Sequence, residues 1–107
     1  MKQDLIIDKA QQFVKLVNHR GITVQQAYLF GSYATNQADE SSDIDVLIVS
    51  DRLGNDLIDE MVMLDKMGDE IDDRIEPHPM SPTDFNEKYN MLAHEIKTYG
   101  IPLIHNE

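Results

Sequence analysis

The chain has 107 residues, with 20 Asp and Glu against 9 Lys and Arg, which gives a formal net charge of −11. This length corresponds to one domain, and 41% hydrophobic residues is typical of a globular chain. The negative charge disfavours direct binding of duplex nucleic acid or of an anionic membrane, and the absence of cysteine excludes disulfides and thiolate sites. No apolar run is long enough to span a membrane, and the first residues do not begin a signal peptide. We therefore expect a single cytoplasmic domain over residues 1–107.

Apolar spacing predicts helices that alternate with strands. Helices are expected over residues 5–20, 55–68 and 85–99, the last interrupted near Asn90, and strands over residues 22–30, 44–49, 74–76 and 101–104. Residues 31–42 are small and polar, which indicates a turn or a short helix. This order predicts an α/β (α+β) fold, in which a small mixed β-sheet is flanked by helices.

Two of the expected strands have features that fix their place in the sheet. Residues 44–49 are β-branched and nearly all apolar, so they are expected to form a central strand covered on both faces. Pro77 and Pro79 are expected to break the strand that begins at Arg74. Pro102 restricts the last strand to an edge of the sheet, because proline cannot donate to a central ladder.

Two aspartates stand at the start of the central strand. Asp43 and Asp45 are two residues apart, so their side chains leave the same face of the strand, with Cα atoms about 6.6 Å apart. Carboxylates this close repel each other unless cations neutralise them. Two divalent ions about 3.5–4 Å apart would relieve the repulsion and bind the phosphates of a nucleotide. Oxygen ligands without His or Cys in the motif favour Mg²⁺ or Mn²⁺ over Zn²⁺.

Gly31 and Ser32 directly follow the first expected strand. A glycine at this point allows a positive φ and close approach to a ligand, and Ser32 adds a neutral hydroxyl donor. These are the groups that hold a terminal phosphate where few cationic side chains are present. Taken alone, Ser32 is more often an ordinary turn residue or helix cap. Taken alone, the pair of aspartates is equally consistent with solvated surface acids.

The two motifs together resemble a known family. Gly31-Ser32, followed after eleven residues by Asp43-Ile44-Asp45 in a strand, is similar to the motif of the polymerase beta-like nucleotidyltransferase superfamily, and the length resembles that of its minimal, antitoxin-type members. The resemblance implies that Gly31 and Ser32 bind a nucleoside triphosphate, with ATP as the expected donor. It also implies that Asp43 and Asp45 bind metal and that a third acid from a neighbouring strand completes a catalytic metal site.

Glu76 is the expected third acid, since it lies in the next strand-like segment after the long helix. Many family members have Asp at this place, and Asp72 and Asp73 are the fallback assignments. The alternative for Glu76 is a surface acid paired with Arg74. His78 is expected to be a loop histidine beside the site.

The turn after Gly31-Ser32 departs from the family pattern. Many minimal members have Arg-Gly after the alanine of this motif, whereas Ala34 is followed here by Thr35 and Asn36. Asn36 is able to adopt the left-handed conformation that a glycine would supply. Thr35 carries no charge, so one phosphate contact is missing. Tyr33 is expected either to stack on a base or to pack in the core.

The resemblance implies a Mg²⁺-dependent nucleotidyltransferase that moves AMP from ATP to a hydroxyl and releases pyrophosphate. Stand-alone minimal members resemble antitoxins that modify HEPN-type toxins, so the expected acceptor is a partner protein, in a homo- or hetero-oligomer. A protein acceptor also suits the acidic surface better than RNA does. The alternative is a non-catalytic, antitoxin-like binding module with a vestigial nucleotide site.

Overall fold

The computed structural model describes residues 2–104. Its elements alternate in the order that the sequence predicts. They are α1 (Lys2–His19), β1 (Gln26–Phe30), the 3₁₀ turn η1 (Gly31–Tyr33), β2 (Ile44–Val49), α2 (Leu57–Asp69), β3 (Ile75–Met80), α3 (Pro82–Phe85), α4 (Met91–Tyr99) and β4 (Ile101–Pro102). Within residues 2–104, no helix is both long enough and apolar enough to cross a membrane.

The four strands form one mixed sheet in the order β3-β2-β1-β4. β1 runs antiparallel to both β2 and β4, whereas β2 and β3 are parallel. The strand with the most apolar sequence, β2, is therefore central, and β4 with its proline lies at an edge, as predicted. The expected α+β fold with a small mixed sheet is confirmed.

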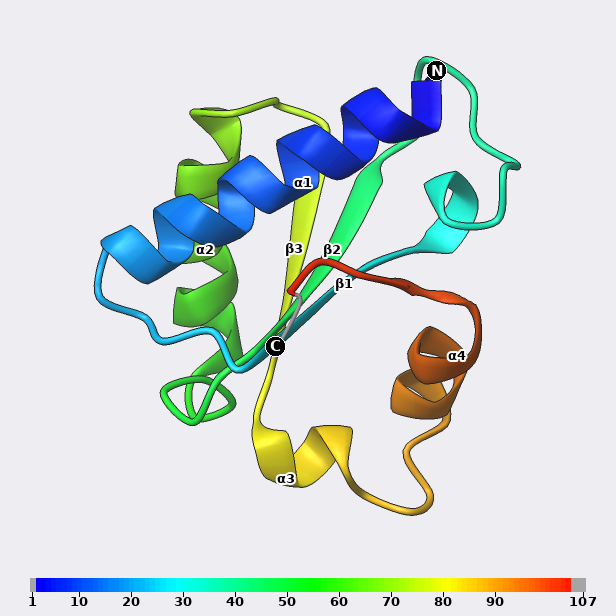
Figure 1. The fold of residues 1–107 in the computed structure, drawn as a ribbon. Coiled ribbons are helices and arrows are strands. Elements are labelled where there is room, and N and C mark those ends of the chain that lie inside the picture. The colour runs from blue at the N-terminus through cyan, green and yellow to red at the C-terminus, as the bar shows by residue number, and fades with distance from the viewer. Residues whose placement is uncertain (1, 105–107) are drawn as a thin grey trace.

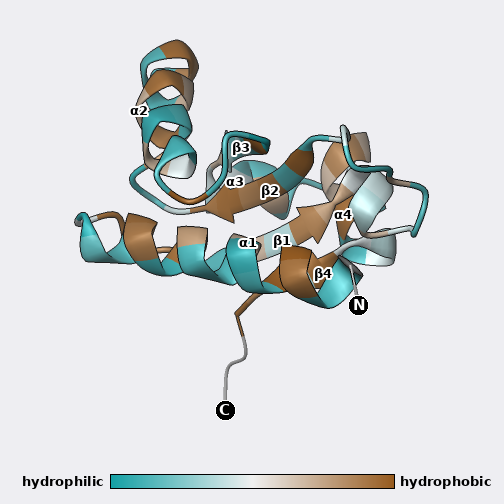
Figure 2. Ribbon diagram, turned by 90° about the horizontal axis from the view of Figure 1, so that it is seen from above, coloured by the Kyte–Doolittle hydropathy of each residue, from teal (hydrophilic) through white to brown (hydrophobic). Residues whose placement is uncertain are grey.

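Helices cover both faces of the sheet. Figure 1 shows α1 and α2 on one side of the strands and α3 and α4 on the other. The larger core lies beneath α1 and α2, where Phe13 and Leu64 pack against Val46 and Ile48 of β2. The smaller core lies beneath α3 and α4. Since β2 contributes to both cores, it is hydrophobic along most of its length (Figure 2).

The strand that contains Pro77 and Pro79 is longer than predicted. β3 continues through both prolines to Met80, so the expectation of a break after residue 76 was wrong. The Arg74 carbonyl accepts a hydrogen bond from the Ile44 N–H of β2 at 2.8 Å, and the Met80 carbonyl accepts one from the N–H of Ser50, which directly follows β2, at 3.1 Å. The alternation of a strand then directs the backbone of residues 77 and 79 to the open edge. There the missing N–H groups of the prolines remove no ladder bond.

The last helical segment is interrupted at Asn90, as predicted. Its first part, α3, begins after Ser81, whose side chain accepts a hydrogen bond from the Asp84 N–H. The second part, α4, begins after Asn90, which caps the Ala93 N–H at 3.0 Å. Gly100 ends this helix, and β4 then pairs with β1. This connection places the end of α4 beside the end of β1.

Candidate functional site

The sheet face beneath α3 and α4 is apolar at one end and polar at the other. Leu47 and Val49 of β2 pack against the two helices. Asp45, two residues before Leu47 and on the same face of β2, stands opposite Phe30 of β1 and Glu76 of β3. The register of three strands thus places a carboxylate on β2 and another on β3 side by side, where the helical cover ends.

Asp45, Glu76 and His78 form a compact group. Each offers one ligand atom, and these atoms all lie within 4.8 Å of one another. His78 Nε2 is 3.2 Å from Asp45 Oδ1, and the imidazole stands edge-on against Phe30, with ring centroids 4.9 Å apart. His78 lies within β3, so the expectation of a loop histidine was wrong. The extension of β3 beyond Pro77 brings this residue into the group.

Asp43 reaches the group through Glu76. A hydrogen bond with the Asp43 carboxylate is the largest cause of a raised Glu76 pKa, and burial and the charge of Asp45 act in the same direction. The charge of His78 acts in the opposite direction, but the Glu76 pKa remains raised. The hydrogen bond with Asp43 and the charge of Asp45 thus disfavour ionisation of Glu76. A proton on Glu76, or a cation, relieves this repulsion.

The turn after β1 lies against the same carboxylates. Gly31 has φ +76°. A Cβ at this position would overlap Asp45 Oδ2, so only glycine allows the turn and the carboxylate to approach this closely. Ser32 follows directly, and Asn36 has φ 60°, which confirms that it adopts the left-handed conformation.

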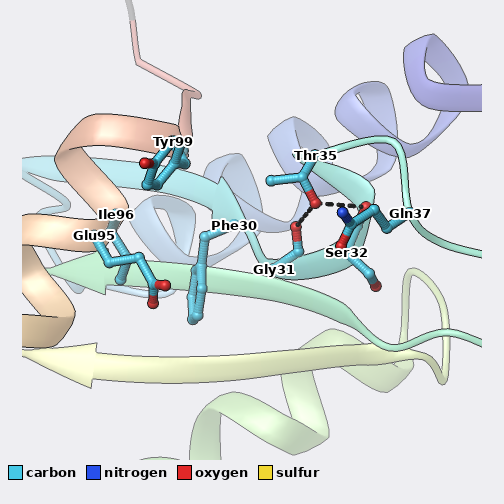
Figure 3. Close-up of a pocket in the computed structure, with 9 residues that line it drawn as sticks. Phe30, Gly31, Ser32, Thr35, Gln37, Glu95, Ile96 and Tyr99 are labelled. Atoms are coloured by element: carbon cyan, nitrogen blue, oxygen red, sulfur yellow. Dashed lines mark hydrogen bonds between the residues drawn. The ribbon is translucent and has the colours of Figure 1, made fainter.

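A cavity of about 380 Å³ opens beside the Gly31-Ser32 turn. Figure 3 shows Thr35 and Gln37 on one side and Glu95 and Tyr99 of α4 on the other, with Phe30 between them. Sequence reasoning missed Glu95 and Tyr99, because only the pairing of β4 with β1 brings α4 to the turn. Their i, i+4 spacing places them on one helix face, but the spacing does not indicate that this face lies beside the Gly31-Ser32 turn.

The other candidate residues lie elsewhere. The Asp72 side chain accepts hydrogen bonds from Lys9 and Arg74, and these bonds, those from Arg74 foremost, hold its pKa far below 3.8. Arg74 therefore pairs with Asp72, and the alternative of an Arg74–Glu76 pair has no support. Asp73 is exposed and does not belong to the group with Asp45. Tyr33 is buried, and its hydroxyl donates to the Asp39 carbonyl, so it packs in the core.

The donor set fits a divalent cation. Carboxylate oxygens converge from β2 and β3, and the missing Cβ at position 31 lets the Asp45 carboxylate lie directly against the turn. Asp45, Glu76 and His78 are placed to bind one ion, with Asp43 adjacent to Glu76. The two sequence motifs contain oxygen donors alone, and the structure adds the imidazole nitrogen of His78.

Solved structures share this fold. A protein of Sulfolobus solfataricus, assigned provisionally as a nucleotidyltransferase, superposes with a TM-score of 0.63 at 23% identity, over 77% of this chain and 72% of that one. A toxin–antitoxin complex with AMP-PNP gives 0.69 at 20% identity, and a mutant of the toxin–antitoxin MntA-HpeT gives 0.68 at 18%. Both comparisons cover 92% of this chain and 74% of the other.

The comparison with curated proteins found no match. The family model of the polymerase beta nucleotidyltransferases matches residues 11–107, which include the Gly31-Ser32 turn, Asp43, Asp45 and Glu76. This match spans most of the sequence and agrees with the likeness in fold. The chain therefore belongs to the polymerase beta nucleotidyltransferase family.

Proposed function

We propose that this protein transfers AMP from ATP to a hydroxyl group of a partner protein, with Mg²⁺ or Mn²⁺ as its cofactor. The observation that carries the proposal is the convergence of Asp43, Asp45 and Glu76, from two strands, beside the Gly31-Ser32 turn. Three acids in contact are unfavourable at neutral pH without a cation, and phosphate groups approach carboxylates only when cations lie between them.

The turn and its cavity have the dimensions and chemistry for the nucleotide. Gly31 and Ser32 offer backbone N–H groups and a hydroxyl to the triphosphate, because no side chain covers the backbone at position 31. A cavity of about 380 Å³ lies within the range of small-ligand sites and has room for a nucleoside. Phe30 and Tyr99 supply aromatic surface for the base, and Glu95 and Gln37 supply acceptors and donors for its polar edge or the ribose.

The reaction forms one bond and breaks one. The acceptor oxygen bonds to the α-phosphorus as the bond from that phosphorus to the pyrophosphate oxygen breaks, and pyrophosphate leaves. A divalent cation bound by Asp43, Asp45 and Glu76 supplies charge neutralisation and a lowered pKa for the acceptor hydroxyl. The proton that the hydroxyl releases passes to solvent water or to a carboxylate oxygen that does not bind the cation.

A protein acceptor is supported by the surface next to Glu76. Met61 and Val62 of α2, both exposed, line a groove with Asp65, Glu76 and Pro77. Exposed Leu57 and Ile58 extend the apolar surface along the helix. Apolar residues flanked by carboxylates complement a partner surface that combines apolar and basic side chains, and a HEPN-type toxin is the partner that we propose.

The test follows the α-phosphate. The protein, ATP and Mg²⁺ are incubated with each product of the two neighbouring genes, in parallel reactions with α-labelled and γ-labelled ATP. We expect the α-label, but not the γ-label, to join one of these proteins, with release of pyrophosphate. Transfer of the γ-label would indicate a kinase instead. Equal labelling by an Asp45→Asn variant would contradict the assigned site.

A second function, a binding module without catalysis, is favoured by one observation. Within the described residues, the cavity lining contains no Lys or Arg, and Thr35 stands where many relatives carry Arg. Such a module would bind the partner, and ATP with a metal, without transfer. Calorimetric binding of ATP and partner, together with unlabelled partner after prolonged incubation, would identify this function.

A further inference from the structure

We propose that His78 is a direct nitrogen ligand of the cation held by Asp45 and Glu76, and that the site therefore prefers Mn²⁺ or a related transition-metal ion to Mg²⁺. The proposal rests on the proposed function only in that these acids bind a divalent cation. It adds a ligand that the two sequence motifs do not contain, since His78 lies outside both.

The distances suit coordination of one ion. In an octahedron with bonds of about 2.1 Å, adjacent ligand atoms are about 3.0 Å apart and opposite ones about 4.2 Å apart. His78 Nε2 and Asp45 Oδ1 are 3.2 Å apart, which is close to the separation of adjacent ligands. The whole group with Glu76 lies within 4.8 Å, so a small inward movement of flexible carboxylates completes the set.

The imidazole is held in place before any ion binds. Pro77 and Pro79 fix φ on both sides of His78, and a residue before proline is itself restricted to extended backbone. The ring rests edge-on against Phe30. The side chains of His78 and Asp45 remain 28% and 23% exposed, so an ion can reach them from solvent. Because the ring is already oriented, little side-chain entropy is lost on binding.

Nitrogen coordination changes the choice of metal. Mg²⁺ favours oxygen ligands and retains its waters, whereas imidazole suits transition-metal ions. We therefore expect Mn²⁺ to bind the metal-free protein at least about tenfold more tightly than Mg²⁺. A hydrogen bond from His78 to Asp45 without coordination would instead orient the carboxylate equally for both ions.

The variant His78→Gln separates these roles, because the glutamine amide can still donate a hydrogen bond to Asp45 but supplies no imidazole nitrogen. His94→Gln is the matched control, since His94 is exposed on α4 and outside the group. Untagged full-length proteins are titrated with Mn²⁺ and with Mg²⁺ in the absence of nucleotide. The bound Mn²⁺ is then examined by electron spin-echo envelope modulation, which detects a directly bound ¹⁴N.

We expect ¹⁴N modulation in the wild type and in His94→Gln and its loss in His78→Gln. We also expect His78→Gln to weaken Mn²⁺ binding about tenfold and Mg²⁺ binding less than about threefold. Wild-type Mn²⁺ without ¹⁴N modulation, or an equal loss for both metals, would overturn the proposal. Label transfer with Mg²⁺ but no ¹⁴N modulation refutes this proposal alone, whereas ¹⁴N modulation without label transfer refutes only the catalytic function.

Discussion

Gly31 packs directly against the carboxylate of Asp45, so the turn after β1 and the start of β2 form one unit. A methyl group at position 31 would overlap Asp45 Oδ2, and the φ of +76° is unfavourable for any residue with a side chain. We expect Gly31→Ala to lower the free energy of unfolding by about 1–2 kcal/mol and to weaken Mn²⁺ binding by displacing Asp45. Urea unfolding and metal titration measure the two effects.

Gly21→Ala is the matched control for this substitution. Gly21 also has a positive φ, +98°, but a Cβ there would have no neighbour within 4 Å. This variant therefore carries the backbone strain without the overlap, and it should retain full Mn²⁺ affinity. If Gly31→Ala also kept that affinity, the turn and the carboxylate would be independent of each other.

Asp45 lies 3.2 Å from His78, packs against Gly31 and raises the pKa of Glu76 through its charge, which makes it the most informative single substitution. If the proposed function is correct, Asp45→Asn should reduce AMP transfer at least about a thousandfold, since the proposed metal site loses its central charge. The variant should fold and be as stable as the wild type or more stable, because a source of repulsion is removed. Initial rates with α-labelled ATP and thermal unfolding test both parts. Asp51→Asn, an exposed acid outside the group, should change neither.

Glu76 gives a prediction with a defined pH dependence. Its pKa in the folded state lies above 4.5, chiefly through the hydrogen bond with Asp43, so the folded chain holds this proton more tightly than the unfolded chain does. The stability that the proton contributes is lost as pH rises from 4.5 through the raised pKa. At pH 7 without metal, Glu76→Gln should therefore raise the melting temperature by at most a few degrees, because the side chain is exposed.

The same comparison at pH 4 should show little difference, since the wild-type glutamic acid is then largely protonated. Addition of Mn²⁺ should raise the melting temperature of the wild type more than that of Glu76→Gln. A variant that is less stable than the wild type at pH 7 without metal would show that repulsion among the acids is not significant.

Asp72 provides an acid-sensitive interaction away from the site. Its carboxylate accepts hydrogen bonds from Lys9 and Arg74, and its pKa lies below 3.8 chiefly because of Arg74. A lowered carboxyl pKa contributes stability that is present above pH 3.8 and lost as pH falls through the folded-state value. We expect Asp72→Asn to reduce the free energy of unfolding by about 2 kcal/mol at pH 7. The difference from the wild type should shrink below pH 3 in urea unfolding, and Asp73→Asn should show no such trend.

The local sequence was sufficient for the fold and for part of the site. The apolar run of β2, the interruption of the last helical segment near Asn90, and the left-handed Asn36 are determined by neighbouring residues, and each was predicted. The continuation of β3 through Pro77 and Pro79 was not predicted. Prolines are acceptable in a strand only at a sheet edge with their backbone turned outward. That placement depends on strand order, which is a property of the whole sheet.

His78, Glu95 and Tyr99 show the same limit at the site. His78 contacts Asp45 only because β3 extends in parallel along β2, and the two α4 residues reach the Gly31-Ser32 turn only because β4 pairs with β1. Spacing along the chain identified Gly31, Ser32, Asp43 and Asp45 because they lie within 15 residues of one another. Contacts between distant strands contain no such local signal.

The charge at position 35 gives the last prediction. Thr35 lines the cavity beside Gly31 and Ser32, and its hydroxyl donates weakly to the Gly31 carbonyl at 3.3 Å, so its removal has a small cost. An arginine there would supply a cation for the triphosphate, and we expect Thr35→Arg to tighten ATP binding about threefold to tenfold at low salt. The gain should decrease with ionic strength, because exposed charges are screened. Thr23→Arg, an exposed threonine in the loop before β1, adds the same charge outside the cavity. Calorimetry that finds equal ATP affinity for the two variants would show that the triphosphate does not lie beside this turn.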